Sequence, residues 1–300
     1  MAAIDLSLLP APEFVEQLDY ETILAEMLAD ARERAAAKGV PFDTISEADP
    51  AYIVLEVAAY RELGVRQRGN EEGRALLLAF AQGADLTHIG ITYYDREPRL
   101  VIVEADPTAN PPVDEVLEDD DSYKRRLMLK DDGYSTAGAT NAYKFHALSA
   151  SGRVKDVAVD SPHPGTTVIY VLSRDGDGTA DDELIALVDA SVQADDVRPL
   201  SEEVIVRSAE IVHWSWSADL YVFNGPDQAL VLQAAIDSGT EFKEKTHVME
   251  NSIALSALYA ALHMPGVAKV VLNDLNADVV CGLGQAPYCD EFTLRIAGQV

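Results

Sequence analysis

Thr167-Val168-Ile169-Tyr170-Val171-Leu172 is the stretch of this 300-residue chain that decides its fold. Its uncharged, mostly β-branched and aromatic residues predict a buried strand. Upstream, the valines of residues 154–159 begin another strand region. Downstream, residues 181–192 predict a helix with an apolar face, and residues 204–206 predict the next strand. Strand, strand, helix and strand in this order are typical of a small α/β sandwich.

The last third of the chain repeats these elements in altered form. Apolar residues alternate with polar ones in a pattern typical of a long strand with one buried face. The expected elements are a strand over 212–222, helices over 226–244 and 252–263, and strands over 267–272 and 292–296. A predicted helix is followed by Gly266 and then by a strand, and the same order of helix, glycine and strand occurs around Gly152. One interpretation is that a single α/β unit has been duplicated.

The first third of the chain is predicted to be helical. Residues 20–37 are rich in strong helix formers. Asp49 can cap a second helix with Pro50 at its first position, where no hydrogen-bond donor is lost. A third helix is expected to open at Asn70 and to end at Gly83. The second helix carries an apolar stripe at helical spacing, formed by Ile53, Val57 and Tyr60 with Val54, Ala58 and Val65 beside them.

The composition changes at Pro98. Residues 104–121 hold eight acidic residues and three prolines, so they are predicted to form an exposed linker rather than a helix. The predicted fold class is α+β, with an N-terminal all-helical domain followed by two small α/β sandwich modules. The expected parts are a helical domain over 1–97, the linker over 98–121, a helix pair with the first module over 122–208, and the second module over 209–300.

The charge of the chain excludes several classes of function. It has 51 acidic and 23 basic residues, a net charge of −28. This argues against binding to nucleic acid, because neutralising phosphates requires clustered Lys and Arg, and against docking on anionic lipid. No apolar stretch approaches the ~20 residues that cross a bilayer. The two cysteines, Cys281 and Cys289, are too few for a disulfide framework, so synthesis in a reducing cytoplasm is expected.

No set of residues forms a catalytic or cofactor-binding motif. Asp175-Gly176-Asp177-Gly178-Thr179-Ala180-Asp181 resembles a calcium loop, but Ala180 and Ala186 stand where an EF-hand needs Gly and Glu. A glycine-rich turn before a helix is favoured, with a weak divalent-ion site as the alternative. For Cys281 and Cys289, free thiols are favoured over a disulfide or a structural zinc site. The residues therefore predict no enzyme activity, no cofactor and no metal.

Several stretches taken in order resemble the baseplate J-like proteins of contractile-tailed bacteriophages, tailocins and related contractile injection systems. The resemblance covers nearly the whole chain, more loosely after Asn273. The link at 97–121 is shorter than in members that place an extra β-rich domain there. The stretches include Glu47-Ala48-Asp49-Pro50-Ala51, Arg66-Gln67-Arg68-Gly69-Asn70-Glu71, Ala81-Gln82-Gly83-Ala84-Asp85-Leu86, Ser135-Thr136-Ala137-Gly138-Ala139 and Pro162-His163-Pro164-Gly165.

This resemblance implies a structural wedge subunit without enzyme activity. Family members pair within each wedge, and the wedges join into a ring around the tail hub. The ring holds the baseplate before sheath contraction and rearranges on triggering. The implied partners are further copies of the chain and other baseplate wedge subunits, with sheath-initiating and hub proteins as additional candidates. The implied location is the baseplate of the virion tail or of a phage-derived particle, assembled in the host cytoplasm.

Two groups of polar residues are candidate contacts with neighbouring subunits. The simplest interpretation of the acidic run 114–121 is a solvated face; the alternative is that its acidic group meets a basic surface, since charged contacts give register with modest net affinity. The second group lies beside the apolar helix; the alternative for it is a solvated helix end with weak local ion pairs. The acidic group is Glu115, Glu118, Asp119 and Asp120. The second group is Arg61, Arg66, Arg68, Asn70 and Glu71.

Two other classes of function remain open at this stage. A tail-tip module could bind a receptor or glycan through the Trp214–Val222 strand, although Trp214 and Trp216 are more simply interpreted as core or interface packing. A metal-dependent hydrolase could be built on the Asp175–Asp181 loop and His163.

Overall fold

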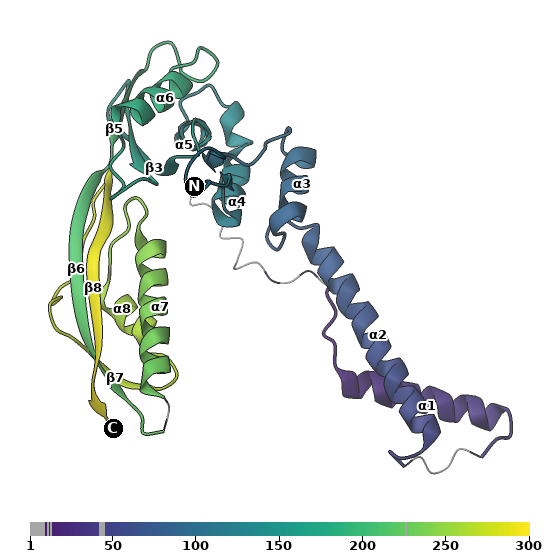
Figure 1. Ribbon diagram of the computed structural model, residues 1–300. Coiled ribbons are helices and arrows are strands. Elements are labelled where there is room, and N and C mark those ends of the chain that lie inside the picture. Colours follow the sequence, from purple (N-terminus) through teal and green to yellow (C-terminus); the bar gives the residue numbers. More distant parts are fainter. Residues whose placement is uncertain (1–9, 11, 13, 42–45, 226) are drawn as a thin grey trace. The chain divides into compact units, whose positions relative to one another are not determined.

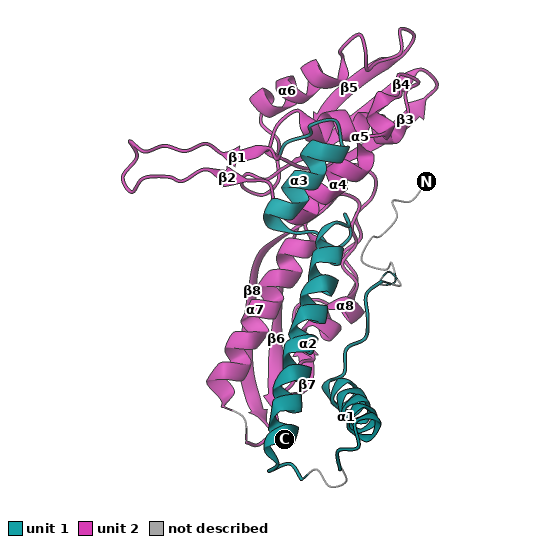
Figure 2. Ribbon diagram, turned by 90° about the vertical axis from the view of Figure 1, so that its right-hand side faces the viewer, with its two compact units in different colours: residues 1–98 teal, residues 99–300 magenta. Residues whose placement is uncertain are grey.

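The computed structural model confirms an α+β architecture in which helices come first (Figure 1). It describes residues 10, 12, 14–41, 46–225 and 227–300; Pro226, where a helix was expected to begin, lies outside them. The chain divides into two compact units, residues 1–98 and 99–300 (Figure 2). No helix in the described part of the chain is both long enough and apolar enough to cross a membrane.

The described residues of unit 1 form three helices, α1 (Tyr20–Ala37), α2 (Pro50–Ala75) and α3 (Gly83–Tyr93). The carboxylate of Asp19 accepts a hydrogen bond from the Thr22 amide and caps α1, and Asp49 caps α2 in the same way. Such caps satisfy amides that have no partner inside the helix, which is worth about 1 kcal/mol each. The two helices pack through the buried residues Ile23, Leu24 and Ala59, with Tyr20, Met27, Leu28, Tyr52, Leu55 and Leu63 around them.

The expected third helix start at Asn70 is wrong. α2 continues through Gly69 and Asn70 to Ala75, and residues 76–80 form turns. The Asn70 side chain does not cap a helix. Instead its Oδ1 accepts from the Glu16 amide at 3.0 Å and its Nδ2 donates to the Glu16 carbonyl at 2.9 Å. A tertiary contact therefore uses the polar side chain that resembled a helix start.

Unit 2 begins with a two-stranded ribbon, not with the expected linker. β1 (Val101–Val103) pairs antiparallel with β2 (Val116–Leu117), and a bridge joins Asp106 to Val113. We call residues 101–117 the ribbon; Figure 2 shows it projecting from the rest of unit 2. Its first strand crosses Gly152 so closely that a Cβ there would lie 2.1 Å from the Val101 carbonyl oxygen. The ribbon is thus seated on the body of unit 2 at its base.

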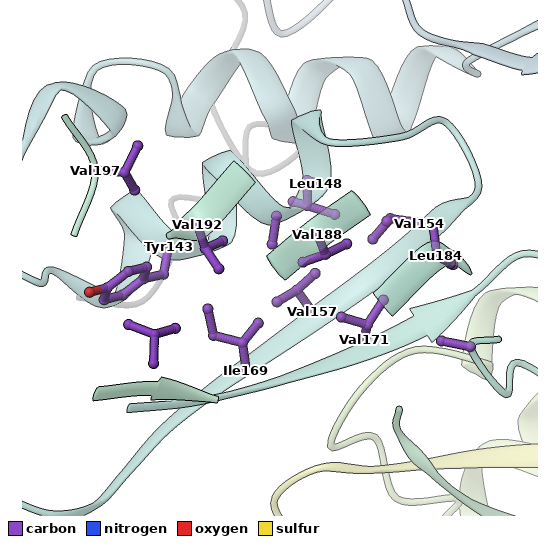
Figure 3. Packing of buried hydrophobic residues seen from close by; sticks show 13 residues of the cluster. Tyr143, Leu148, Val154, Val157, Ile169, Val171, Leu184, Val188, Val192 and Val197 are labelled. Atoms are coloured by element: carbon purple, nitrogen blue, oxygen red, sulfur yellow. The ribbon is translucent and has the colours of Figure 1, made fainter. Parts of the chain in front are cut away.

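The first module has a three-stranded sheet of order β3-β4-β5. β3 (Val154–His163) is antiparallel to β4 (Thr166–Ser173), and β5 (Glu203–Ser208) is parallel to β4, joined to it through α6 (Asp182–Val192). α4 (Asp120–Leu129), a short 3-10 turn (Asp132–Tyr134) and α5 (Thr140–Ser149) precede the sheet. Its core is a cluster in which Tyr143, Leu148, Ile169, Val171, Leu184 and Val188 meet (Figure 3).

The second module has a three-stranded sheet of order β7-β6-β8. β6 (Glu210–Val222) lies in the centre, antiparallel to β7 (Val267–Leu272) and parallel to β8 (Gln285–Gln299). α7 (Gln228–Thr246) and α8 (Leu255–Leu262) cover one face (Figure 1). Trp216 stacks on Phe292 with ring centroids 5.0 Å apart. Gly239 of α7 approaches these rings closely, since a Cβ there would lie 2.9 Å from Phe292.

The two sheets share a pairing pattern but not a connectivity. Each has a central strand with an antiparallel strand on one edge and a parallel strand on the other. In the first module the chain visits edge, centre, helix and edge; in the second it visits centre, two helices and then both edges. A simple tandem copy of one unit would keep the order, so the difference argues against that interpretation.

Candidate interaction surfaces

The base of the ribbon is held by a buried ion pair. Arg126 of α4 is fully buried and Glu118 is 6 % exposed, and Arg126 Nη2 lies 2.8 Å from Glu118 Oε2. The Glu118 carboxylate also accepts from the Leu100 amide, and its own amide donates to the Leu100 carbonyl. The Glu118 carboxylate, expected to meet a neighbouring subunit, is therefore engaged with a buried guanidinium of the same chain.

Asp119 and Asp120 are also engaged within unit 2. Asp119 caps α4 by accepting from the Ser122 amide at 2.9 Å, and it lies 3.6 Å from Arg174. Burial alone would raise the pKa of Asp119, but the hydrogen bonds from Ser122 and the charge of Arg174 together hold it below its usual value. Asp120 forms an ion pair with Arg99. Of the four expected acidic contacts, Glu115 alone is exposed with no partner among the described residues.

Beyond its base, the ribbon exposes apolar side chains. Val101, Val103, Val113, Val116 and Leu117 are each 39–47 % exposed. No third strand pairs with β1 or β2 within the described residues. The sequence interpretation used the acids and prolines of this segment and missed these residues. The signal was present in Val101-Ile102-Val103 and Val116-Leu117, two short runs of strand-forming residues on either side of a turn-rich stretch.

A second apolar surface lies on α2. The residues of the expected stripe are not buried: Ile53, Val57, Tyr60 and Val65 are 48–71 % exposed. The α1–α2 packing instead uses Ala59, Leu55 and Leu63, which lie elsewhere on the helix. We call the exposed side the α2 face. It contains a groove of about 680 Å³ lined by Tyr20, Glu56, Val57, Tyr60, Arg61, Gly64, Val65 and Arg68.

Of the five polar residues expected on this helix, three bond to other residues of unit 1 and two do not, among the described residues. Arg66 forms ion pairs with Glu62 and, at 3.4 Å, with Glu16, and Glu71 accepts from Gln67 at 2.8 Å. Asn70, expected to touch a partner, is buried and bonded to the Glu16 backbone. Arg61 and Arg68 are exposed, and neither has an acidic partner among the described residues. The structure thus brings these two arginines to an apolar groove.

The loop that resembled a calcium site is held by an arginine. Arg153 Nε lies 2.8 Å from Asp175, the same guanidinium pairs with Asp181, and Glu183 lies 3.6 Å away. Asp181 also caps α6. Within the described residues, no three His, Cys, Asp or Glu side chains come together as a metal site requires. His163, the other expected hydrolase residue, lies at the turn between β3 and β4, opposite Thr166.

The aromatic residues of β6 do not form an exposed binding face. Trp214 and Trp216 are buried beneath the helices of the second module, which confirms the interpretation as packing. A glycan-binding platform on these two rings is therefore contradicted. Cys281 and Cys289 are buried free thiols, and burial raises the pKa of each.

Half-buried Lys155 and buried His247 form a pair of titratable groups between the two modules of unit 2. Lys155 Nζ of β3 lies 2.9 Å from Nδ1 of His247, just after α7. Burial and the nearby charge of Arg174 lower the pKa of Lys155 to about 8. Burial and the charge of Lys155 lower the pKa of His247 to about 4. Beside this pair, Asp156 accepts from the Met249 amide at 3.0 Å. These contacts join β3 to the segment after α7.

Comparison with known proteins decides the family. The chain is 40 % identical to the baseplate protein J of Escherichia phage P2 over 305 residues, which cover 99 % of each chain. Residues 47–106 match the model of the baseplate J-like N-terminal domain, and residues 135–208 match that of the baseplate J-like central domain. The chain belongs to the baseplate J-like family. This baseplate J-like chain is accordingly a structural component of the tail baseplate.

The solved structures add a distant likeness. A chain of the anti-feeding prophage (AFP) baseplate, determined by cryo-EM, aligns with a TM-score of 0.40 and 11 % identity. The alignment covers 63 % of this baseplate J-like chain and 50 % of that chain.

Proposed function

We propose that this chain is the wedge subunit of the baseplate. Copies pair within a wedge, wedges join into a ring around the tail hub, and the ring holds the baseplate until it rearranges and the sheath contracts. The chain works through contacts with its own copies and with other wedge subunits, without catalysis. The similarity to baseplate protein J covers 99 % of both chains and is not confined to a single domain, which supports this role.

One observation in the structure carries the assembly part of this proposal. The α2 face leaves Ile53, Val57, Tyr60 and Val65 largely exposed on one helix. Contiguous exposed apolar residues with polar neighbours are typical of protein-binding surfaces. Arg61, Arg66, Arg68 and Glu71 supply the polar neighbours on α2, and Glu115, Asp119 and Asp120 supply those at the ribbon. We place subunit contacts at both surfaces, with Glu118 and Asn70 as internal supports.

Location and stoichiometry test this function. Quantitative mass spectrometry of purified, uncontracted particles is expected to find the chain at several copies per particle. Immunogold labelling is expected to mark the end of the tail farthest from the capsid. Particles that lack the chain, or that carry it at a single copy, would contradict a paired wedge subunit.

A further inference from the structure

The ribbon has the properties of a segment that needs a cover. It contains two short strands with free edges in the described chain, and five of its apolar side chains are more than a third exposed. Two-stranded ribbons are marginally stable in water unless a face is covered by another element. The base supplies rigid support through Glu118 and Arg126, but nothing equivalent covers the outer part among the described residues. Its charge indicates the kind of cover: Glu104, Asp106, Asp114 and Glu115 are acidic, and residues 101–117 contain no Lys or Arg.

The α2 groove has the complementary properties. Its walls are apolar at Val57, Tyr60 and Val65, which suits valine side chains from an incoming segment. Arg61 and Arg68 lie along it without an acidic partner in the described chain, and Glu56 is the acid among its lining residues. Burying exposed apolar area drives association, and opposite charges at the rim fix the register.

We infer that the ribbon of one copy docks in the α2 groove of a second copy. A chain with a net charge of −28 repels its own copies over most of its surface, so contact between copies is favoured where an acidic segment meets arginines. The two surfaces differ, so the contact is heterologous: each copy offers a ribbon to one neighbour and a groove to another. Contacts of this type close into rings when the rotation between copies is right. The inference rests on the proposed self-association and specifies its site.

Charge reversal with rescue tests the contact in the full-length chain. Self-association of the wild type, Glu115→Arg, Arg61→Glu and the double variant is measured by analytical ultracentrifugation at low salt. Each single reversal is expected to weaken association roughly tenfold, because like charges then face each other at the rim. The double variant, and an equimolar mixture of the two single variants, are expected to regain wild-type association, since each reversed ribbon then meets a reversed groove.

Matched controls separate the contact from a change in net charge. Asp196→Arg in the α6–β5 loop and Arg32→Glu on α1 make the same changes of charge at exposed positions that belong to neither the ribbon nor the groove lining. Neither is expected to rescue the opposite single variant. Rescue by a control would show that the overall charge, and not the ribbon and groove, governs association.

A disulfide crosslink tests whether the segment in the α2 groove is the ribbon of a second copy. Val116→Cys in one tagged chain and Val57→Cys in another are expected to form a disulfide between the two chains on mild oxidation, while Cys281 and Cys289 are buried. A disulfide formed only within a chain that carries both substitutions would overturn the inference, because the ribbon would then occupy its own groove. If the wild type associates and none of the charge reversals weakens that association, the ribbon–groove contact is overturned, while the proposed pairing of copies still stands. A wild type that stays monomeric would contradict self-pairing itself.

Discussion

α2 and α6 are both amphipathic helices, but their apolar residues have opposite environments. On α6, Leu184, Val188 and Val192 are fully buried against the sheet of the first module (Figure 3). On α2, Ile53 and Val57 recur at the same spacing and are about half exposed. Burying such a side chain contributes about 1.5–3 kcal/mol. α6 gains this free energy when its own unit folds, whereas the packing of α1 against α2 leaves the α2 face without it.

The ribbon shows the same contrast within one segment. Glu118, at its base, is buried and paired with Arg126, whereas Glu115, three residues earlier, is exposed and unpaired among the described residues. The Glu118 carboxylate therefore contributes to the stability of folded unit 2, whereas the Glu115 carboxylate lies on its surface. Substitutions at the two classes of position should therefore separate stability from association.

The largest difference is expected between Glu118→Ala and Glu115→Ala. Glu118→Ala removes the carboxylate that lies 2.8 Å from the buried Arg126 guanidinium, and breaking such a buried ion pair should cost about 3–5 kcal/mol of unfolding free energy. Glu115→Ala should change it by less than about 0.5 kcal/mol. Urea unfolding followed by tryptophan fluorescence reports on unit 2 alone, since the chain's two tryptophans, Trp214 and Trp216, both lie there. Equal stability of the two variants would show that the buried pair does not support the fold.

The next largest difference in stability is expected when the same substitution, Val→Ala, is made on α6 and on α2. Val188→Ala in α6 removes two buried methyl groups and should cost about 2 kcal/mol. Val57→Ala in α2 removes them from an exposed site and should cost less than about 0.5 kcal/mol. Thermal unfolding followed by far-UV circular dichroism measures both. A large loss at Val57 in the isolated chain would mean that the α2 face is already covered by its own chain.

Periodicity predicted both helices because it reports amphipathicity and nothing more. The spacing of Leu184 and Val188 and that of Ile53 and Val57 are the same signal. Whether the apolar side faces the same chain or another depends on which segments the tertiary fold brings to it. The caps were easier to predict, since Asp49 and Asp181 act on amides only a few residues away.

The candidate site was harder to predict, because its pairs are distant in sequence. The partner of Asn70 is the backbone of Glu16, and the partner of Asp175 and Asp181 is Arg153. A run of acids looked solvated because no base lies within it, but Arg126 and Arg174 approach it from other elements. What the sequence did supply was the chemistry of the two surfaces: arginines beside an apolar helix, and acids beside a turn.

The two modules of unit 2 should respond to acid through His247. Its pKa in the folded chain is about 4, below the usual value near 6.5, so the folded state disfavours its protonation. The stability linked to this group is full above pH 6.5 and is lost as the pH falls towards 4. Between pH 7 and pH 5 the unfolding free energy of the wild type should fall by about 1–2 kcal/mol because of His247.

The variant His247→Gln isolates that contribution. Glutamine can still accept a hydrogen bond from Lys155 but does not titrate. The difference in unfolding free energy between wild type and variant, measured by urea unfolding at each pH, should fall from pH 7 to pH 5. Asp177, Lys243 and Lys155 face His247 in both proteins, so their own titration largely cancels. A difference that stays constant with pH would show that His247 is protonated equally in the folded and unfolded chains.

The smallest effect is expected at Asp119, which the sequence suggested as a contact and which the structure places at the start of α4. Asp119→Ala removes the hydrogen bond to the Ser122 amide and should lower the stability of unit 2 by about 1 kcal/mol. Asp119→Asn keeps a capping oxygen and should lose less than half of that. Fluorescence-monitored urea unfolding of both variants, with self-association measured in parallel, distinguishes the two roles. If asparagine restores stability but association stays weak, the Asp119 charge also takes part in a subunit contact; if it restores both, Asp119 belongs, like Glu118, to the inside of its own unit.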